Sequence, residues 1–297
     1  MDPDQIKKII KGLSLLGEVY IHCRQNEFKR FGNIEKDWRD ALKFFLKHYA
    51  FERQGAPKAY PDSAVESFDK IAANCPGKEL AEKVWKEFRE DLNGDLKKKK
   101  IGLNEKNNPL FFEDNPGKEK DVITFCEKIE MEYKYNIFQF AKKGFEDNGK
   151  YLKDTHDSFK KIRGIGDKIA SFFLRDVAFL DKNISINELE KLQDRWLLQP
   201  VDLWIKRTVS FLDGPNEQEN KEIAKRLVEM ADDAQCCALS LNAGAWYLGA
   251  EIATTERRFE DCLKNVGGLK KNIEKWLSPR QEETKKLSDV FDKIKEI

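Results

Sequence analysis

The sequence predicts an all-α protein, and three observations support this class. The composition is biased toward Lys, Glu and Leu, and charged residues make up 36% of the chain. Apolar residues recur every three or four positions in most segments, which is typical of helices with one buried face. No segment shows the alternation of apolar and polar residues that marks a half-buried strand.

Glycine- and proline-rich stretches divide this helical pattern into separate elements. The first helix is predicted near residues 3–31, where Ile6, Ile9, Leu13 and Leu16 form one apolar stripe. The stretches ERQGAPKAYPDS (52–63) and DLNGDLKKKKIGLNEKNNPL (91–110) are predicted to be turns or loops. Further helices are predicted over 36–51, 63–73, 78–92, 121–145, 167–179, 203–212, 219–230, 234–250 and 272–297, with another helix ending at 158–162 and a further helical piece within 183–198.

At 297 residues, the chain is long enough for one large domain or two modest ones. We expect an N-terminal helical region over 1–120 that packs partly on the C-terminal lobe. The remaining residues, 121–297, are expected to form a second region.

Charge and hydropathy bear on the class of partner. The 54 Lys and Arg residues nearly balance the 53 Asp and Glu residues, so composition alone does not indicate a nucleic-acid-binding protein. No apolar run approaches the roughly 20 residues of a membrane-spanning helix, and the N-terminus lacks the pattern of a signal peptide. We therefore expect a soluble, intracellular protein of the cytoplasm or nucleoid, with no membrane partner.

The cysteine and histidine residues do not suggest a metal centre. The six cysteines are scattered, so reduced thiols are expected and the ligands of an iron–sulfur cluster are missing. His22, His48 and His156 have no companion at ligand spacing, so we predict no metal site.

The stretch KKIRGIGDKIASFFL (160–174) predicts two helices joined by a tight turn, a helix-hairpin-helix pattern. Gly164 and Gly166 would let the backbone approach a ligand closely. The amide groups at the start of the second helix lack partners within the helix, and phosphate is an anion that such a helix end binds well.

Lys160, Lys161 and Arg163 add positive charge to the same turn. Contacts to phosphate do not depend on the base sequence, so they would position the DNA without distinguishing one sequence from another. A purely structural turn is the alternative interpretation.

A second motif, QPVDLWIKR (199–207), follows the hairpin and favours a functional interpretation of it. Together the two motifs resemble the helix-hairpin-helix DNA glycosylases, in which a lysine just past the hairpin is the nucleophile and an aspartate opens a later helix. By this resemblance, Lys168 takes the position of the nucleophile and Asp202 that of the essential aspartate. The resemblance covers about 121–250 and implies the helix-hairpin-helix glycosylase fold, with two helical lobes and a central cleft.

The sequence departs from the general family pattern at several positions, and these departures indicate which branch of the glycosylases it resembles. Arg163 stands where many members have proline, and Trp204 stands where endonuclease III and its relatives commonly have histidine. The interval from Lys168 to Asp202 is longer than in most of the superfamily. This interval, the PVD-x-W string and the missing cysteine cluster together resemble the archaeal 8-oxoguanine glycosylases.

The chemistry of base excision explains these two residue types. Breaking an N-glycosidic bond develops positive charge on the sugar, which a nucleophile can capture or an anion can stabilise. A lysine attacks only as the neutral amine, and the positive end of a helix together with partial burial favours that form. For Asp202 the alternative role is an N-cap after Pro200, which is compatible with catalysis.

Base excision also requires the target nucleotide to leave the duplex and enter a pocket. Phe172, one turn after Lys168, and Trp246 are the predicted walls of that pocket, with core packing as the alternative. Gln25 resembles an amide that reads the base, and Gln54 is a candidate to fill the gap left in the duplex. Surface polarity is the alternative for both glutamines.

The resemblance therefore implies a bifunctional DNA glycosylase and abasic-site lyase. Its expected partner is damaged duplex DNA, the expected lesion is 8-oxoguanine, and a monomer is expected. No cofactor is implied, apart from a monovalent cation that the hairpin carbonyls hold in related proteins. Three alternatives stay open: a glycosylase for another modified base, a non-enzymatic DNA-binding hairpin, and a helical interaction protein.

Overall fold

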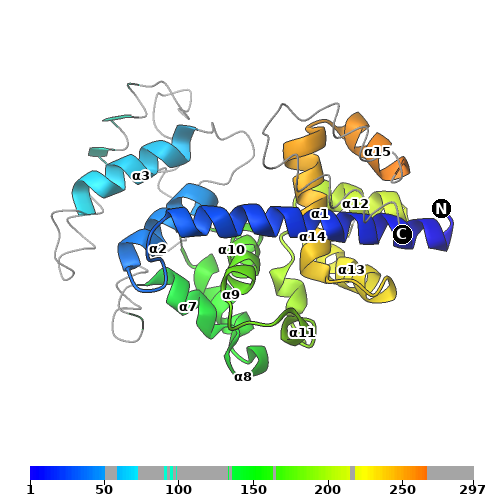
Figure 1. The fold of residues 1–297 in the computed structure, drawn as a ribbon, viewed down its shortest axis with the longest axis horizontal. Helices are drawn as coiled ribbons and strands as arrows, with labels where there is room; N and C mark the ends of the chain where they lie inside the picture. Colours follow the sequence, from blue (N-terminus) through cyan, green and yellow to red (C-terminus); the bar gives the residue numbers. More distant parts are fainter. Residues whose placement is uncertain are drawn as a thin grey trace. The chain divides into compact units, whose positions relative to one another are not determined.

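The structure is a computed structural model that describes residues 1–50, 59–72, 136–162, 165–214 and 218–265, with isolated positions between 90 and 133. This part of the chain is helical and contains no strand, which confirms the all-α class (Figure 1). Its elements are α1 (Pro3–Arg30), α2 (Trp38–Phe45), the π-helical turn η1 (Leu46–Ala50), α3 (Ala59–Ala72), α7 (Ile137–Lys143), α8 (Glu146–Gly149), α9 (Leu152–Lys160), α10 (Asp167–Leu180), α11 (Ile186–Leu189), the 3-10 helix η5 (Arg195–Leu198), α12 (Leu203–Asp213), α13 (Asn220–Asp233), α14 (Ala238–Tyr247), the π-helical turn η6 (Leu248–Ala253) and α15 (Glu256–Lys264).

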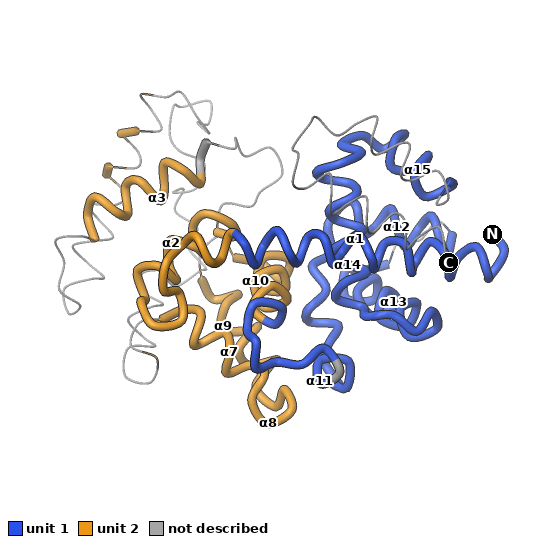
Figure 2. The backbone as a smooth tube through the Cα atoms, viewed as in Figure 1, with its two compact units in different colours: residues 1–26, 178–297 blue, residues 27–177 orange. Residues whose placement is uncertain are grey.

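The chain forms two compact units (Figure 2). Unit 1 comprises Met1–Asn26 and Ala178–Ile297, and unit 2 comprises Glu27–Val177. This division differs from the boundary predicted at residue 120, which lies outside the described residues. Helices α1 and α10 each contribute residues to both units.

One predicted helix, over 121–145, is wrong in its described part. The backbone of Asn136 is extended, and α7 begins only after it. The Asn136 side chain accepts hydrogen bonds from the amides of Phe138 at 2.9 Å and Gln139 at 3.0 Å. This is N-cap geometry, so a new helix starts where the apolar periodicity suggested continuation.

The helical piece predicted within 183–198 consists of two short helices. Ser185 begins α11 with a capping box, because its hydroxyl accepts from the amide of Glu188 while the Glu188 carboxylate accepts from the amide of Ser185. The chain then forms the 3-10 helix η5, and its backbone is extended at Gln199. These short helices leave room for an extended segment before α12.

Aromatic side chains form the core of unit 2. Phe173 of α10 lies 4.8 Å from Phe45 of α2, 4.9 Å from Tyr49 of η1 and 5.3 Å from Phe159 of α9, measured between ring centroids. All four rings are buried. This cluster fixes α9 and α10 against α2, and so holds both arms of the predicted hairpin.

Two glycines allow α1 and α14 to approach closely in unit 1. A Cβ atom at Gly244 would lie 1.7 Å from the carbonyl oxygen of Leu13, and one at Gly17 would lie 2.0 Å from that of Ser240. Both obstacles are backbone atoms, which cannot rotate away. The N-terminal helix therefore packs directly on a C-terminal helix of the same unit.

We predict that Gly244→Ala lowers the free energy of unfolding by about 2 kcal/mol or more, because the helices must separate. Urea unfolding would measure this change. Gly166→Ala is the matched control, because a Cβ there meets nothing within 4 Å and the residue has no positive φ. Equal stability of the two variants would contradict the close crossing of α1 and α14.

Candidate functional site

The predicted hairpin is formed by α9 and α10. The amide of Ile162 donates to the carbonyl of Phe159 at 3.0 Å, and the amide of Ile165 donates to the carbonyl of Ile162 at 3.1 Å. The amide of Ala170, in the first turn of α10, donates to the carbonyl of Gly166 at 3.0 Å. Helices are therefore present on both sides of the expected turn, while Arg163 and Gly164 lie outside the described residues.

Gly166 immediately precedes α10 and leaves open space at its Cα atom. No described residue, its chain neighbours aside, lies within 4 Å of the position that a Cβ would take, and its φ is not in the left-handed region. The backbone thus does not require glycine at this position for its conformation. The open space is compatible with close approach of an anion to the first turn of α10.

The charges of the hairpin are partly paired within the chain. Lys160, the last residue of α9, lies 2.7 Å from the carboxylate of Asp167, the first residue of α10, and 3.7 Å from Asp157. The hydrogen bond to Asp167 raises the pKa of Lys160, so this side chain is charged at neutral pH. Lys161 caps α9 and is exposed. Of these two lysines, Lys161 is the one directed toward solvent.

His156 of α9 lies beneath the hairpin. It is 1% exposed, and its Nε2 atom lies 3.1 Å from the hydroxyl of Ser171 on α10. Burial lowers the pKa of His156; the charge of Lys160 acts in the same direction, whereas Asp167 and Asp157 oppose it. His156 is therefore a neutral contact between the two helices at neutral pH.

We predict that His156 makes the protein less stable in acid. Below the ordinary histidine pKa of 6.5, the unfolded chain binds a proton that folded His156 resists, so stability falls as pH falls. Urea unfolding at pH 7.5 and pH 5 would measure this loss, which for one proton is at most about 1.4 kcal/mol per pH unit. In His156→Gln the loss should be smaller, and an unchanged pH dependence in that variant would contradict the assignment.

Lys168 is the second residue of α10 and is half-buried. Phe172 follows on the same helix, one turn later, as the sequence predicted. The Phe172 ring is 1% exposed, lies 5.5 Å from the ring of Tyr49, and has the guanidinium of Arg175 4.7 Å from its centroid. These contacts are those of core packing, and the role of Phe172 as a wall for a base stays a prediction.

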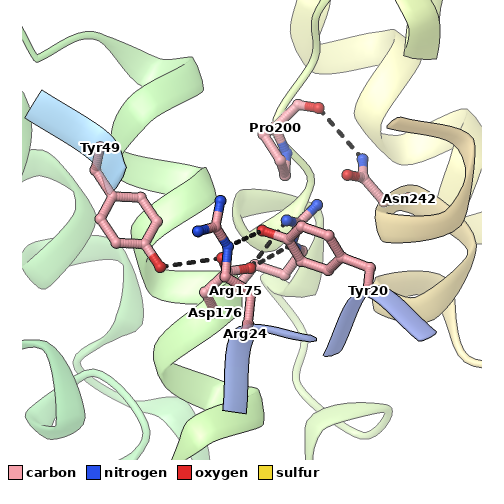
Figure 3. A network of polar contacts seen from close by, with 7 residues as sticks. All are labelled: Tyr20, Arg24, Tyr49, Arg175, Asp176, Pro200 and Asn242. Carbon is pink, nitrogen blue, oxygen red and sulfur yellow. Dashed lines mark hydrogen bonds and ion pairs between the residues drawn. The ribbon is translucent and has the colours of Figure 1, made fainter. Parts of the chain in front are cut away.

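A buried polar network continues along α10 from Phe172 (Figure 3). Arg175 donates to one carboxylate oxygen of Asp176 at 2.9 and 3.0 Å, and the hydroxyl of Tyr49 donates to the other at 3.0 Å. Arg175 and Asp176 are almost completely buried. The ion pair is thus held in the core, and the bond from Tyr49 to Asp176 ties α10 to η1.

Asp202 is the N-cap of α12, as the structural alternative predicted. Its Oδ1 atom accepts hydrogen bonds from the amides of Trp204 at 2.9 Å and Ile205 at 3.0 Å. The Trp204 ring packs 5.1 Å from the ring of Phe259, and a Cβ at Gly249 would lie 2.2 Å from it. The start of α12 is therefore firmly held, and with it the Asp202 carboxylate.

We predict that Asp202→Ala destabilises the protein by about 1 kcal/mol, because two amide donors lose their acceptor. Asp202→Asn should retain wild-type stability, since asparagine caps helices as well as aspartate does. Urea unfolding of the two variants provides the comparison. If the asparagine variant lost as much stability as the alanine variant, the charge rather than the cap would be holding α12.

The other predicted pocket residues in unit 1 have specific contacts. Trp246 of α14 is half-buried and meets the ring of Tyr20 of α1 edge to face, at 5.6 Å. Arg24 donates to the hydroxyl of Tyr20 at 2.9 Å. The amide nitrogen of Gln25 lies 3.4 Å from the carbonyl of Phe179, a long hydrogen bond. Gln54 lies outside the described residues.

Sequence reasoning missed two polar residues near Asp202. Asn242 is completely buried in α14 and donates to the carbonyl of Pro200 at 3.3 Å (Figure 3). Gln199, the residue before Pro200, is 2% exposed. A single amide within the otherwise apolar and small run ALSLNAGAWY was a signal that pointed to Asn242.

Two of the described cysteines are thiols of low reactivity. Cys23, Cys236, Cys237 and Cys262 form no disulfide, and burial raises the pKa of Cys236 and of Cys262 to about 12. These thiols are protonated at neutral pH and therefore weak nucleophiles and ligands. Cys75 and Cys126 lie outside the described residues.

Neither a metal cluster nor a membrane span is found within the described residues. No group of three or more histidine, cysteine or acidic side chains there could hold a metal ion. None of the helices in that part of the chain is long and apolar enough to cross a bilayer.

No family model, curated protein or solved structure matches this chain. The functional proposal therefore depends on the residues themselves.

Proposed function

We propose that this chain is a bifunctional DNA glycosylase and abasic-site lyase that removes an oxidised purine from duplex DNA. The observation that supports this most is the α9–α10 hairpin, with Lys168 in the first turn of α10. The order of hairpin, lysine and later aspartate is the one that resembles the helix-hairpin-helix glycosylases. The N-cap position of Asp202 is compatible with that order.

The hairpin would bind the phosphate backbone of DNA. Gly166 leaves open space before α10, and the positive end of that helix favours an anion. Lys161 offers an exposed charge at the same turn, whereas Lys160 would have to exchange Asp167 for a phosphate. We therefore expect the hairpin to add a small number of ionic contacts and a moderate dependence on salt.

Lys168 would be the nucleophile. Its neutral amine forms a bond to C1′ of the deoxyribose as the glycosidic bond breaks, and the departing base takes the bonding electron pair and a proton. Opening of the sugar gives an imine between Nζ and C1′. Loss of a proton from C2′ then expels the 3′ phosphate, so base removal and strand cleavage use the same residue.

Asp202 would stabilise the positive charge that develops on the sugar. Its Oδ1 atom already accepts two amide hydrogen bonds, which fix the position of the carboxylate. A carboxylate held in this way needs little reorganisation when charge develops near it. We therefore expect Asp202→Asn to keep the helix cap while slowing base removal.

The preferred lesion is 8-oxoguanine, because the PVD-x-W string and the long interval from Lys168 to Asp202 resemble that branch of the family. A glycosylase for another modified base is the alternative within the same mechanism. Duplexes that carry single lesions of different types, compared at equal concentration, distinguish the two.

We predict that the protein forms a covalent adduct with 8-oxoguanine duplex DNA when borohydride is present, because borohydride reduces the imine to a stable amine. Lys168→Gln should abolish both the adduct and strand cleavage, since the amide has no nucleophilic nitrogen. Denaturing gel electrophoresis of labelled DNA measures both products.

Lys161→Gln is the matched control, because it removes one positive charge from the same hairpin. It should weaken DNA binding and reduce its salt dependence while the adduct still forms. Persistent strand cleavage by Lys168→Gln would instead support a hairpin that only binds DNA. An absence of salt-dependent DNA affinity in the wild type would support an unrelated interaction protein.

A further inference from the structure

Gln199 has a buried side-chain amide that makes no hydrogen bond to any described residue. The residue lies in the extended segment between η5 and α12, and its backbone amide donates to the carbonyl of Trp196 at 3.1 Å. Its side chain is 2% exposed, yet neither Oε1 nor Nε2 has a partner among the described residues. A donor and an acceptor are therefore both unsatisfied on one side chain.

Such an arrangement is costly in the free protein. More than nine in ten buried polar groups in folded proteins have a hydrogen-bond partner. Each buried group that lacks a partner lowers the stability of the protein by about 1–3 kcal/mol. Leucine has a similar volume and would fill the same space without that cost. Because no described residue satisfies this amide, a bound ligand or an ordered water has to supply its hydrogen bonds.

The position of Gln199 indicates what that partner is. Three residues separate it along the chain from Asp202, so their Cα atoms lie within about 11 Å. The next residue, Pro200, accepts a hydrogen bond through its carbonyl from Asn242 (Figure 3). Trp246 follows Asn242 by one turn of α14. Gln199 thus belongs to the part of unit 1 that carries the proposed charge-stabilising carboxylate and one proposed wall for the base.

We propose that the Gln199 carboxamide binds the target base, before its removal, at an edge where an N–H group lies beside a C=O group. Nε2 donates to the carbonyl of the base while Oε1 accepts from the adjacent N–H, giving two parallel hydrogen bonds. Oxidised and deaminated purines present such lactam edges. This inference rests on the proposed glycosylase function and adds a residue that recognises the base.

A residue that contacts the base matters only while the base is attached. We therefore predict that Gln199→Leu slows removal of 8-oxoguanine from duplex DNA at least about tenfold in single-turnover experiments, for the loss of about 1.4 kcal/mol of binding. Cleavage at a preformed abasic site in the same duplex should stay within about twofold of the wild type. Gel electrophoresis of the two substrates measures both rates.

The melting temperature of the free protein provides a second readout. Because leucine removes two unsatisfied polar atoms, Gln199→Leu should melt at the same temperature as the wild type or higher. Gln193→Leu is the matched control: its side chain is exposed in the same unit, so neither reaction should change.

Two results would overturn the inference while leaving the proposed function intact. Unchanged removal of 8-oxoguanine by Gln199→Leu would show that the amide does not contact the base. A lower melting temperature with equal losses on both substrates would show that the amide binds a structural water instead. A wild-type protein that acts on neither substrate would overturn the proposed function itself, and this inference with it.

Discussion

The amide groups in the first turn of a helix need acceptors, and this requirement governs both candidate catalytic positions. Helix α12 meets it internally, because Asp202 accepts from two of its amides. Helix α10 is preceded by Gly166, which has no side chain to act in the same way. One helix start is thus closed by the carboxylate that precedes it, whereas at the other the nearby carboxylate of Asp167 pairs with Lys160. The sequence places a lysine at the start of α10 and an aspartate at the start of α12.

Under the proposed function, internal charge pairing would limit how strongly the hairpin attracts DNA. Lys160 is held by Asp167, and the chain as a whole has a formal charge of only +1. Affinity would have to come from local contacts rather than from a broad positive field, which favours a protein that releases undamaged DNA readily. The buried pair of Arg175 and Asp176 has a different consequence, because it anchors the middle of α10 in the core. The helix that carries Lys168 is therefore fixed along its length.

Much of the fold could be predicted from the sequence. Helical periodicity located α1, α12 and α13 to within a few residues, and the spacing of the glycines located the turn between α9 and α10. The break before α7 was missed, because Asn136 lies within a run whose apolar spacing continues across it. Its capping bonds depend on the local backbone, which periodicity does not report.

The candidate site shows the same division. The position of Lys168 at the start of a helix and the N-cap role of Asp202 both follow from local sequence rules, because each depends on neighbours within four residues. The bond between Asn242 and Pro200 joins residues that are far apart in the chain, and the unused amide of Gln199 depends on burial by the folded unit. Neither is encoded in a short pattern, which is why both appeared only in the structure.

The close crossing of α1 and α14 has a consequence for the order in which the protein is assembled. Unit 1 combines the first residues of the chain with residues that follow Val177, whereas unit 2 is a continuous segment. During synthesis, unit 2 can complete its aromatic core while the part of α1 that belongs to unit 1 still lacks its partner helix. We expect the apolar stripe of that part to stay exposed until α14 leaves the ribosome. Late synthesis is thus the stage at which aggregation, and protection by chaperones, matter most for this chain.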